Sequence, residues 1–399
     1  MKKLNTQLMS AQKLAAPKEV ISHLSYQQLD TLHVLRGFCA FYVVIYHAKF
    51  ILWSGGQQYL EAIPRSGWQL IDYFAFSVDM LSAAGYEMVI FFFVLSGFFI
   101  RYAFIRKPRT PWSFYFNRIV RIYPPFIISL LLAGTILYIL SNYFLNTIQA
   151  GSSRELNQNL NSAWMSMQVL DFWELLKSIV FLPLNIEYLG NNVVYWSLLP
   201  EALFYLLVPF VFRMAPSYYA LSVLSYIISV IMIRMGITTI WVWMLQYNLF
   251  FALGAALYDT IVKTKILERV RKLPGLLLWA LVLGLLLLLI GMALVKLKLL
   301  AAFMAGILAV VAVLVLLAGK IAQNNFVFRA FHKLGVFSFS LYLYHYPLLL
   351  LCYGLMVAIT GKLFWYERYY LLIVPLVTVI CYGLYWITER VFVNYFRKM

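Results

Sequence analysis

The 399-residue chain is too apolar for a water-soluble protein: 63% of its residues are hydrophobic and 12% charged, against about 45–50% and about 25% in soluble domains. A folded chain of this size cannot bury so much apolar surface in a core, so its solvent must be lipid. The net charge of +17 does not indicate nucleic acid, because Lys and Arg stand in short clusters between apolar runs, as in membrane proteins.

Ten apolar runs are long enough to cross a bilayer, which takes about 20 residues. They predict an all-α, polytopic membrane protein with about ten transmembrane helices. A shorter apolar stretch, 172–184, is expected to form an interfacial or re-entrant helix. The expected spans are 34–53, 86–105, 123–145, 196–213, 217–235, 238–258, 275–295, 299–319, 335–357 and 369–389.

The segments between the spans predict topology and domain organisation. Residues 1–30 lack the apolar core of a signal peptide, so we expect a cytosolic tail followed by one transmembrane domain over 31–399. Ten spans put both termini on one side, and most of the 32 Lys and Arg residues lie inside if that side is the cytosol. This predicts an N-in, C-in topology. Two long outside segments, 54–85 and 146–195, are typical of functional or disordered loops.

The first expected span carries two ionisable residues at a helical spacing. Arg36 and His47 are eleven residues apart, so on an α-helix they differ by about 20° around the axis and about 16 Å along it. An ionisable group as deep as His47 is costly in a membrane, which indicates a functional site. The alternative is a polar side chain that only bonds across helices.

This pair and four further segments occur in a characteristic order. The segments are 92–98 (FFVLSGF), 117–124 (NRIVRIYP), 196–201 (WSLLPE) and 340–347 (SLYLYHYP). Together with the Arg-x10-His spacing, the set resembles the acyltransferase 3 family of membrane-bound, acyl-CoA-dependent O-acyltransferases. The resemblance implies transfer of an acyl group, most simply acetyl, from cytosolic acyl-CoA to a hydroxyl of an extracytoplasmic glycan or lipid-linked glycan. It also implies a bacterial inner membrane and a role in polysaccharide modification of the cell envelope.

The resemblance implies that His47 is catalytic. As a general base it would take the proton of the acceptor hydroxyl, and as a nucleophile it would carry the acyl group. We favour the base, because an acyl-imidazole hydrolyses readily. The second catalytic candidate is Glu201, which has three open roles: to orient His47, to hold sugar hydroxyls, or to pair with a buried arginine such as Arg36.

The donor site is expected at the cytosolic mouth, where Arg36, Arg118 and Arg121 would bind the phosphates of coenzyme A, since guanidinium binds phosphate bidentately. Membrane anchoring is the alternative for Arg118 and Arg121, and it is the favoured interpretation of other basic residues nearby. Further donor-side candidates are Ser96, Gly97 and Tyr123, although a Ser-Gly pair is more often a helix-packing site. The other basic residues are Arg101, Arg106, Lys107 and Arg109.

Trp196 and His345 are candidates for the acceptor side. A structural hydrogen bond is favoured for His345, because Pro347 frees a backbone carbonyl nearby. The three cysteines show no metal-ligand spacing, so no metal is expected. Two other functions stay open, a glycolipid transporter or flippase and a non-catalytic assembly or sensor protein. The chain lacks the inverted repeat of many transporters, which counts against the first of these.

Overall fold

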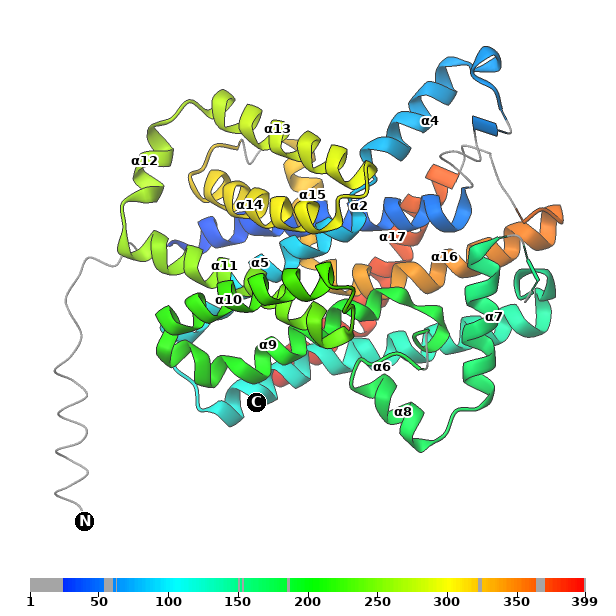
Figure 1. The fold of residues 1–399 in the computed structure, drawn as a ribbon, viewed down its shortest axis with the longest axis horizontal. Coiled ribbons are helices and arrows are strands. Elements are labelled where there is room, and N and C mark those ends of the chain that lie inside the picture. Colours follow the sequence, from blue (N-terminus) through cyan, green and yellow to red (C-terminus); the bar gives the residue numbers. More distant parts are fainter. Residues whose placement is uncertain are drawn as a thin grey trace.

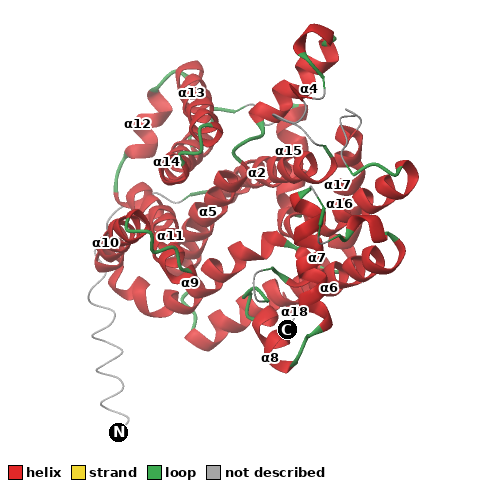
Figure 2. Ribbon diagram, turned by 45° about the vertical axis from the view of Figure 1, so that its right-hand side comes forward, coloured by secondary structure: helices red, strands yellow, loops and turns green. Residues whose placement is uncertain are grey.

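The computed structural model describes residues 24–53, 60–61, 63–149, 151–152, 154–184, 187–321, 325–363 and 370–397. Within these ranges every regular element is a helix (Figure 2), as the apolar runs predict. Most of the expected tail, 1–23, lies outside the described residues. The first described helix begins at Tyr26, so its first five residues belong to the segment expected to be tail.

Nine helices of the described residues are long and apolar enough to cross a membrane, which confirms the all-α polytopic fold. One of them, Val193–Arg234, is a 42-residue stretch that contains both the fourth and fifth expected spans. It divides into α9 (Leu198–Val211) and α10 (Ala215–Arg234), with a 3₁₀ turn between them. The 14 residues of α9 rise about 21 Å, less than the apolar thickness of a bilayer of about 30 Å. Its flanking turns extend it.

The other membrane-crossing helices form a bundle around α2 and α5, with the α13–α14 hairpin on one flank and α6 on another (Figure 1). Small residues let the central helices approach closely. A Cβ on Gly97 would lie 2.0 Å from the carbonyl oxygen of Phe251, and one on Gly254 would lie 1.8 Å from that of Val94. The helices are α2 (Tyr26–Leu52), α5 (Gly85–Arg106), α6 (Pro111–Tyr143), α11 (Ile240–Lys263), α13 (Gly275–Leu294), α14 (Lys298–Leu317), α16 (Ser338–Thr360) and α17 (Tyr370–Ile387).

Shorter helices cover the ends of the bundle. The eight residues of α8 are too few to cross a bilayer, and Phe172 and Trp173 are exposed on it, as expected of an interfacial or re-entrant helix. The ninth expected span began at residue 335, but the chain bends at Phe337, between α15 and α16. These shorter helices are α4 (Leu70–Leu81), α7 (Glu155–Gln168), α8 (Phe172–Ile179), α12 (Ile266–Lys272), α15 (Phe326–Val336) and α18 (Glu389–Arg397).

Candidate active site

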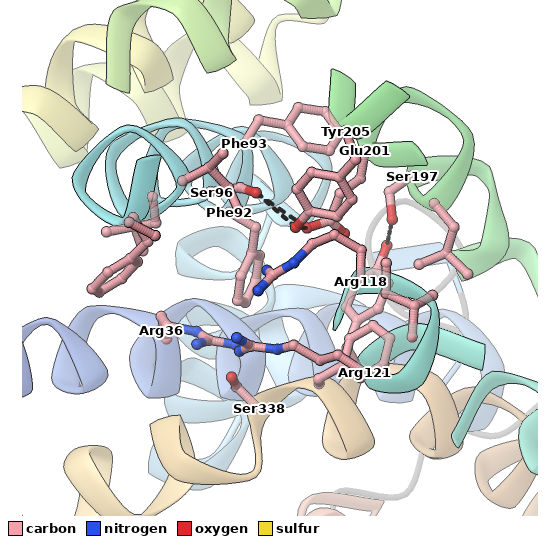
Figure 3. A pocket seen from close by; sticks show the side chains of 18 of the residues that line it. Arg36, Phe92, Phe93, Ser96, Arg118, Arg121, Ser197, Glu201, Tyr205 and Ser338 are labelled. Carbon is pink, nitrogen blue, oxygen red and sulfur yellow. Dashed lines mark hydrogen bonds between the residues drawn. The ribbon is translucent and has the colours of Figure 1, made fainter. Parts of the chain in front are cut away.

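A cavity of about 460 Å³ lies between α2, α5, α6, α9 and the beginning of α16 (Figure 3). Its volume falls within the range of about 300–1,000 Å³ that is typical of small-molecule sites. Half of the ten residues predicted from the sequence line it: Arg36, Ser96, Arg118, Arg121 and Glu201. They come from four different helices, so the fold brings together residues that are far apart in the chain.

Three arginines give this cavity a positive charge. Arg36 lies on α2, and Arg118 and Arg121 lie three residues apart on α6, which puts them on neighbouring positions of one face. Figure 3 shows the guanidinium groups of Arg36 and Arg121 pointing toward one another, and the charge of Arg121 acts on Arg36. Glu201 is the one acidic side chain among the described residues of the lining. The lining therefore attracts anions.

The cavity arginines keep hydrogen-bond donors that the protein does not use. Within the described ranges, Arg36 and Arg121 donate no hydrogen bond, and the buried Nε of Arg118 has no partner. Arg101, outside the cavity, differs: it donates two bonds to the Asp259 carboxylate, 2.8 and 2.9 Å long, and a third of 3.0 Å to a backbone carbonyl. Arg101 is therefore structural, whereas the cavity arginines are available to a ligand.

Glu201 is held in the cavity wall by two hydroxyl groups. Ser96 Oγ donates a hydrogen bond of 3.2 Å to its carboxylate, and the Tyr205 hydroxyl donates to the same oxygen. The guanidinium of Arg118 lies over the Tyr205 ring, 5.6 Å from its centroid. The Glu201 charge also acts on Arg36 and Arg118. Among the described residues Glu201 makes no ion pair with a cavity arginine and no hydrogen bond to His47, so its three predicted roles stay open.

His47 lies beyond the end of the cavity and does not line it. Its Nδ1 is 2.9 Å from Nε2 of His345 on α16, and the two rings stack with centroids 5.1 Å apart. The Tyr346 ring stands edge-on to His47, and the side chain of His47 is only partly buried. The group next to the predicted catalytic histidine is thus a second histidine, which the sequence analysis placed on the acceptor side.

Tyr342 separates the cavity from the two histidines. Its ring lines the cavity, and its centroid is 6.2 Å from that of His345. Its hydroxyl donates a 3.0 Å hydrogen bond to the Val194 carbonyl and lies 2.8 Å from Ser197 Oγ. Arg36 and His47 share a helix as predicted, but of the two only Arg36 lines the cavity.

Pro347 determines where His345 lies. Proline has no N–H, so the carbonyl of Leu343, four residues earlier, loses its helical partner. Ser129 Oγ and Asn192 Nδ2 donate to this carbonyl instead, at 2.9 and 3.1 Å. On the same helix, His345 Nδ1 donates to the carbonyl of residue 341 at 2.9 Å. His345 therefore bonds to a carbonyl of its own helix and contacts His47, while the carbonyl that Pro347 frees is bonded by Ser129 and Asn192; the acceptor-side role of His345 stays a prediction.

The three remaining predicted residues lie outside the cavity lining. Gly97 packs against α11, where even a Cβ would not fit, so its position suits helix packing and leaves no room for coenzyme A. Tyr123 packs against Phe181, with ring centroids 5.6 Å apart. Trp196 stacks on Tyr86 at 5.2 Å. Tyr123 and Trp196 are thus packing aromatics in this structure.

Several residues of the lining were not predicted from the sequence. Tyr205 follows Glu201 by four positions, so helical spacing alone places both side chains on one face. Ser197 and Tyr342 lie inside the segments 196–201 and 340–347, where only their neighbours were singled out. The described residues contain no group of three or more His, Cys, Asp or Glu side chains able to hold a metal ion.

Comparison with known proteins gives one match. No curated protein and no solved structure matches the chain. A family model described as an acyltransferase domain matches residues 29–387, nearly the whole chain. The matched range contains the cavity arginines, the two stacked histidines and all four characteristic segments. The chain therefore belongs to the acyltransferase 3 family and is a multi-pass membrane acyltransferase.

Proposed function

We propose that this protein transfers an acyl group, most simply acetyl, from cytosolic acyl-CoA to a hydroxyl of a glycan or lipid-linked glycan on the other side of the membrane. The observation that carries the donor is the set of unused guanidinium donors on Arg36, Arg118 and Arg121 around one cavity. Coenzyme A carries its phosphates at one end, and charge-assisted bonds from guanidinium to phosphate are among the strongest in proteins.

The shape of the site also suits coenzyme A. Arg36 and His47 are separated by about 16 Å along α2, so a nucleotide held by the arginines can extend its thin pantetheine arm toward His47. Aromatic and aliphatic side chains between them, including Phe92 and Leu198, give the arm an apolar wall. Tyr342 must move for the thioester to reach His47.

In the reaction we propose, His47 is the general base. The acceptor oxygen bonds to the thioester carbonyl carbon while the hydroxyl proton passes to His47, a step that typically contributes about 10²–10⁴-fold to the rate. The carbon–sulfur bond breaks, and the departing sulfur of coenzyme A takes that proton from His47. An ester and free coenzyme A are the products, and His47 returns to its starting form.

The proposed orientation puts the cavity arginines on the cytosolic side, with both chain termini inside and the protein in a bacterial inner membrane. Arg36 lies nearer the beginning of α2 and His47 nearer its end, so donor and acceptor approach the site from opposite faces of the bilayer. The acceptor then comes from the side of α7, in the polar segment that was predicted to lie outside.

Binding of acetyl-CoA to the purified protein in nanodiscs tests the donor. Arg36→Gln and Arg121→Gln should each weaken binding about 10-fold or more, because a hydrogen bond to a charged group contributes about 1.5–3 kcal/mol. Arg106→Gln is the matched control: it removes an equal charge from the last turn of α5, and Arg106 does not line the cavity. Equal weakening by all three variants would mean only long-range attraction and would contradict the proposed site.

Turnover tests the acceptor side. Mass spectrometry of surface glycans from cells with and without the gene should reveal an acyl mass that depends on the protein and on His47. A glycolipid transporter, the alternative function, would instead leave acetyl-CoA unconsumed and change only where the glycolipid is found.

A further inference from the structure

We infer that His345 is a positioning residue for His47, which it holds in the tautomer that leaves Nε2 free to accept a proton. That this tautomer assists acyl transfer rests on the proposed function, whereas the tautomer itself is a property of the protein without substrate. The contact between the two rings joins α2 to α16 across 298 residues of sequence. It therefore depends on the folded bundle and not on local structure.

The hydrogen-bond partners determine where each proton lies. A backbone carbonyl can only accept, so His345 Nδ1, 2.9 Å from the Leu341 carbonyl, must carry a proton. In a neutral ring, Nε2 of His345 is then an acceptor. His47 Nδ1 lies 2.9 Å from it and must donate. A neutral His47 with its proton on Nδ1 has an unprotonated Nε2.

The surrounding helices hold His345 in place. Ser129 from α6 and Asn192 from the start of a 3₁₀ turn both bond to the carbonyl that Pro347 frees, two residues before His345. Ser340 Oγ donates to Glu389 at 2.7 Å, and the Tyr344 hydroxyl donates to the Pro125 carbonyl at 3.0 Å. The segment 340–347 is thus fixed to three other parts of the chain.

A neutral partner suits this depth in the membrane. A carboxylate beside His47 would also fix its tautomer, but it would place a full negative charge among apolar helices at a high desolvation cost. His345 accepts the same hydrogen bond without a charge. When Nε2 of His47 takes the hydroxyl proton, the Nδ1–H bond to His345 remains and stabilises the imidazolium, until the departing sulfur removes the proton from Nε2.

Nitrogen NMR of the protein labelled at histidine and reconstituted in lipid reads the tautomer directly. The chain has five histidines, so single substitutions assign every signal. We expect His47 to carry its proton on Nδ1 in the wild type. In His345→Leu, which removes the acceptor, His47 should shift toward the Nε2–H form that a free histidine side chain prefers in water. A wild-type His47 with its proton on Nε2 would overturn the inference without any activity measurement.

Kinetics of acyl transfer test whether the tautomer of His47 matters for catalysis. His345→Leu should lower kcat by about 100-fold, the scale of a disabled general base, and leave KM for acetyl-CoA unchanged because His345 does not line the cavity. His345→Gln places an amide oxygen near the lost nitrogen and should restore most of kcat. His332→Gln, on α15 and paired with Asp30, is the control and should behave as wild type.

Two results would refute the positioning role. One is a His345→Leu protein with unchanged kcat. The other is equal loss in the Leu and Gln variants while His47 keeps its proton on Nδ1 in both, since the tautomer would then not explain the loss. If the wild type shows no acyl transfer at all, the proposed function fails, but the NMR measurement still decides whether His345 sets the tautomer of His47.

Discussion

The contrast between structural and ligand-binding arginines can be tested through the Arg101–Asp259 pair. This ion pair joins α5 to α11, and its side chains are only 10% and 8% exposed. Asp259 also accepts a 2.9 Å hydrogen bond from the Tyr219 hydroxyl on α10. Asp259→Asn keeps the size of the side chain but removes its charge, so the guanidinium of Arg101 stays buried without a counter-charge.

Breaking a buried ion pair by removing one partner costs about 3–5 kcal/mol. The asparagine oxygen can still accept one of the three bonds made to Asp259, so we expect the lower end, about 3 kcal/mol. This corresponds to a shift of about 100-fold in the unfolding equilibrium. The double variant Arg101→Leu/Asp259→Leu, which leaves no buried charge, should lose less stability than Asp259→Asn.

Unfolding of the purified protein by a denaturing detergent measures these losses, and acetyl-CoA binding measured below the transition separates stability from affinity. We expect Asp259→Asn to unfold at lower detergent but to bind acetyl-CoA like the wild type. Arg36→Gln should show the reverse pattern. If Asp259→Asn keeps wild-type stability and loses affinity instead, the division of arginines by their internal hydrogen bonds is wrong.

Three further variants test other parts of the structure. Gly254→Ala should prevent the close approach of α5 and α11, so that size-exclusion chromatography shows no folded protein. Gly284→Ala on α13 should fold normally, because no neighbouring atom lies within 4 Å of the added Cβ. Tyr205→Phe keeps the ring beneath Arg118 but removes the hydroxyl donor, so detergent unfolding should show a loss of about 1–3 kcal/mol with little change in acetyl-CoA affinity. Ser129→Ala leaves the Leu343 carbonyl one donor and should cost about 1 kcal/mol in the same assay; a loss above that of Asp259→Asn would contradict this estimate.

Much of the fold follows from the sequence, because hydropathy alone locates helices in a bilayer. It locates them less well where a helix is short or interrupted. In α9, 14 helical residues depend on flanking turns, and at Phe337 a break separates α15 from α16 within one apolar run. At both places side chains of other helices bond to backbone carbonyls, Arg101 to that of Phe212 and His33 to that of Gly335, and a window of apolar residues does not record such contacts.

The candidate site was predictable in part for a similar reason. Helical spacing places Arg118 and Arg121 on one face of a helix, and the preference of guanidinium for phosphate predicts that these arginines bind an anion. The partner of His47 could not be found in this way, since the rotation of α16 against α2 is set by packing and by the carbonyl freed at Pro347. Glu201 is the acidic residue of the characteristic segments, and its predicted roles, which included orienting His47, stay predictions.

Tyr342 has a consequence for the cell as well as for the site. If the proposed function holds, the two substrates reach the site from opposite faces of the bilayer, and a continuous file of water between those faces would let protons run down their gradient. Tyr342 lines the donor cavity, its hydroxyl bonds to the Val194 carbonyl and to Ser197, and its ring lies beside that of His345. In the proposed reaction, Tyr342 would be the side chain that keeps the donor cavity and the histidine pair from joining into one water-filled passage.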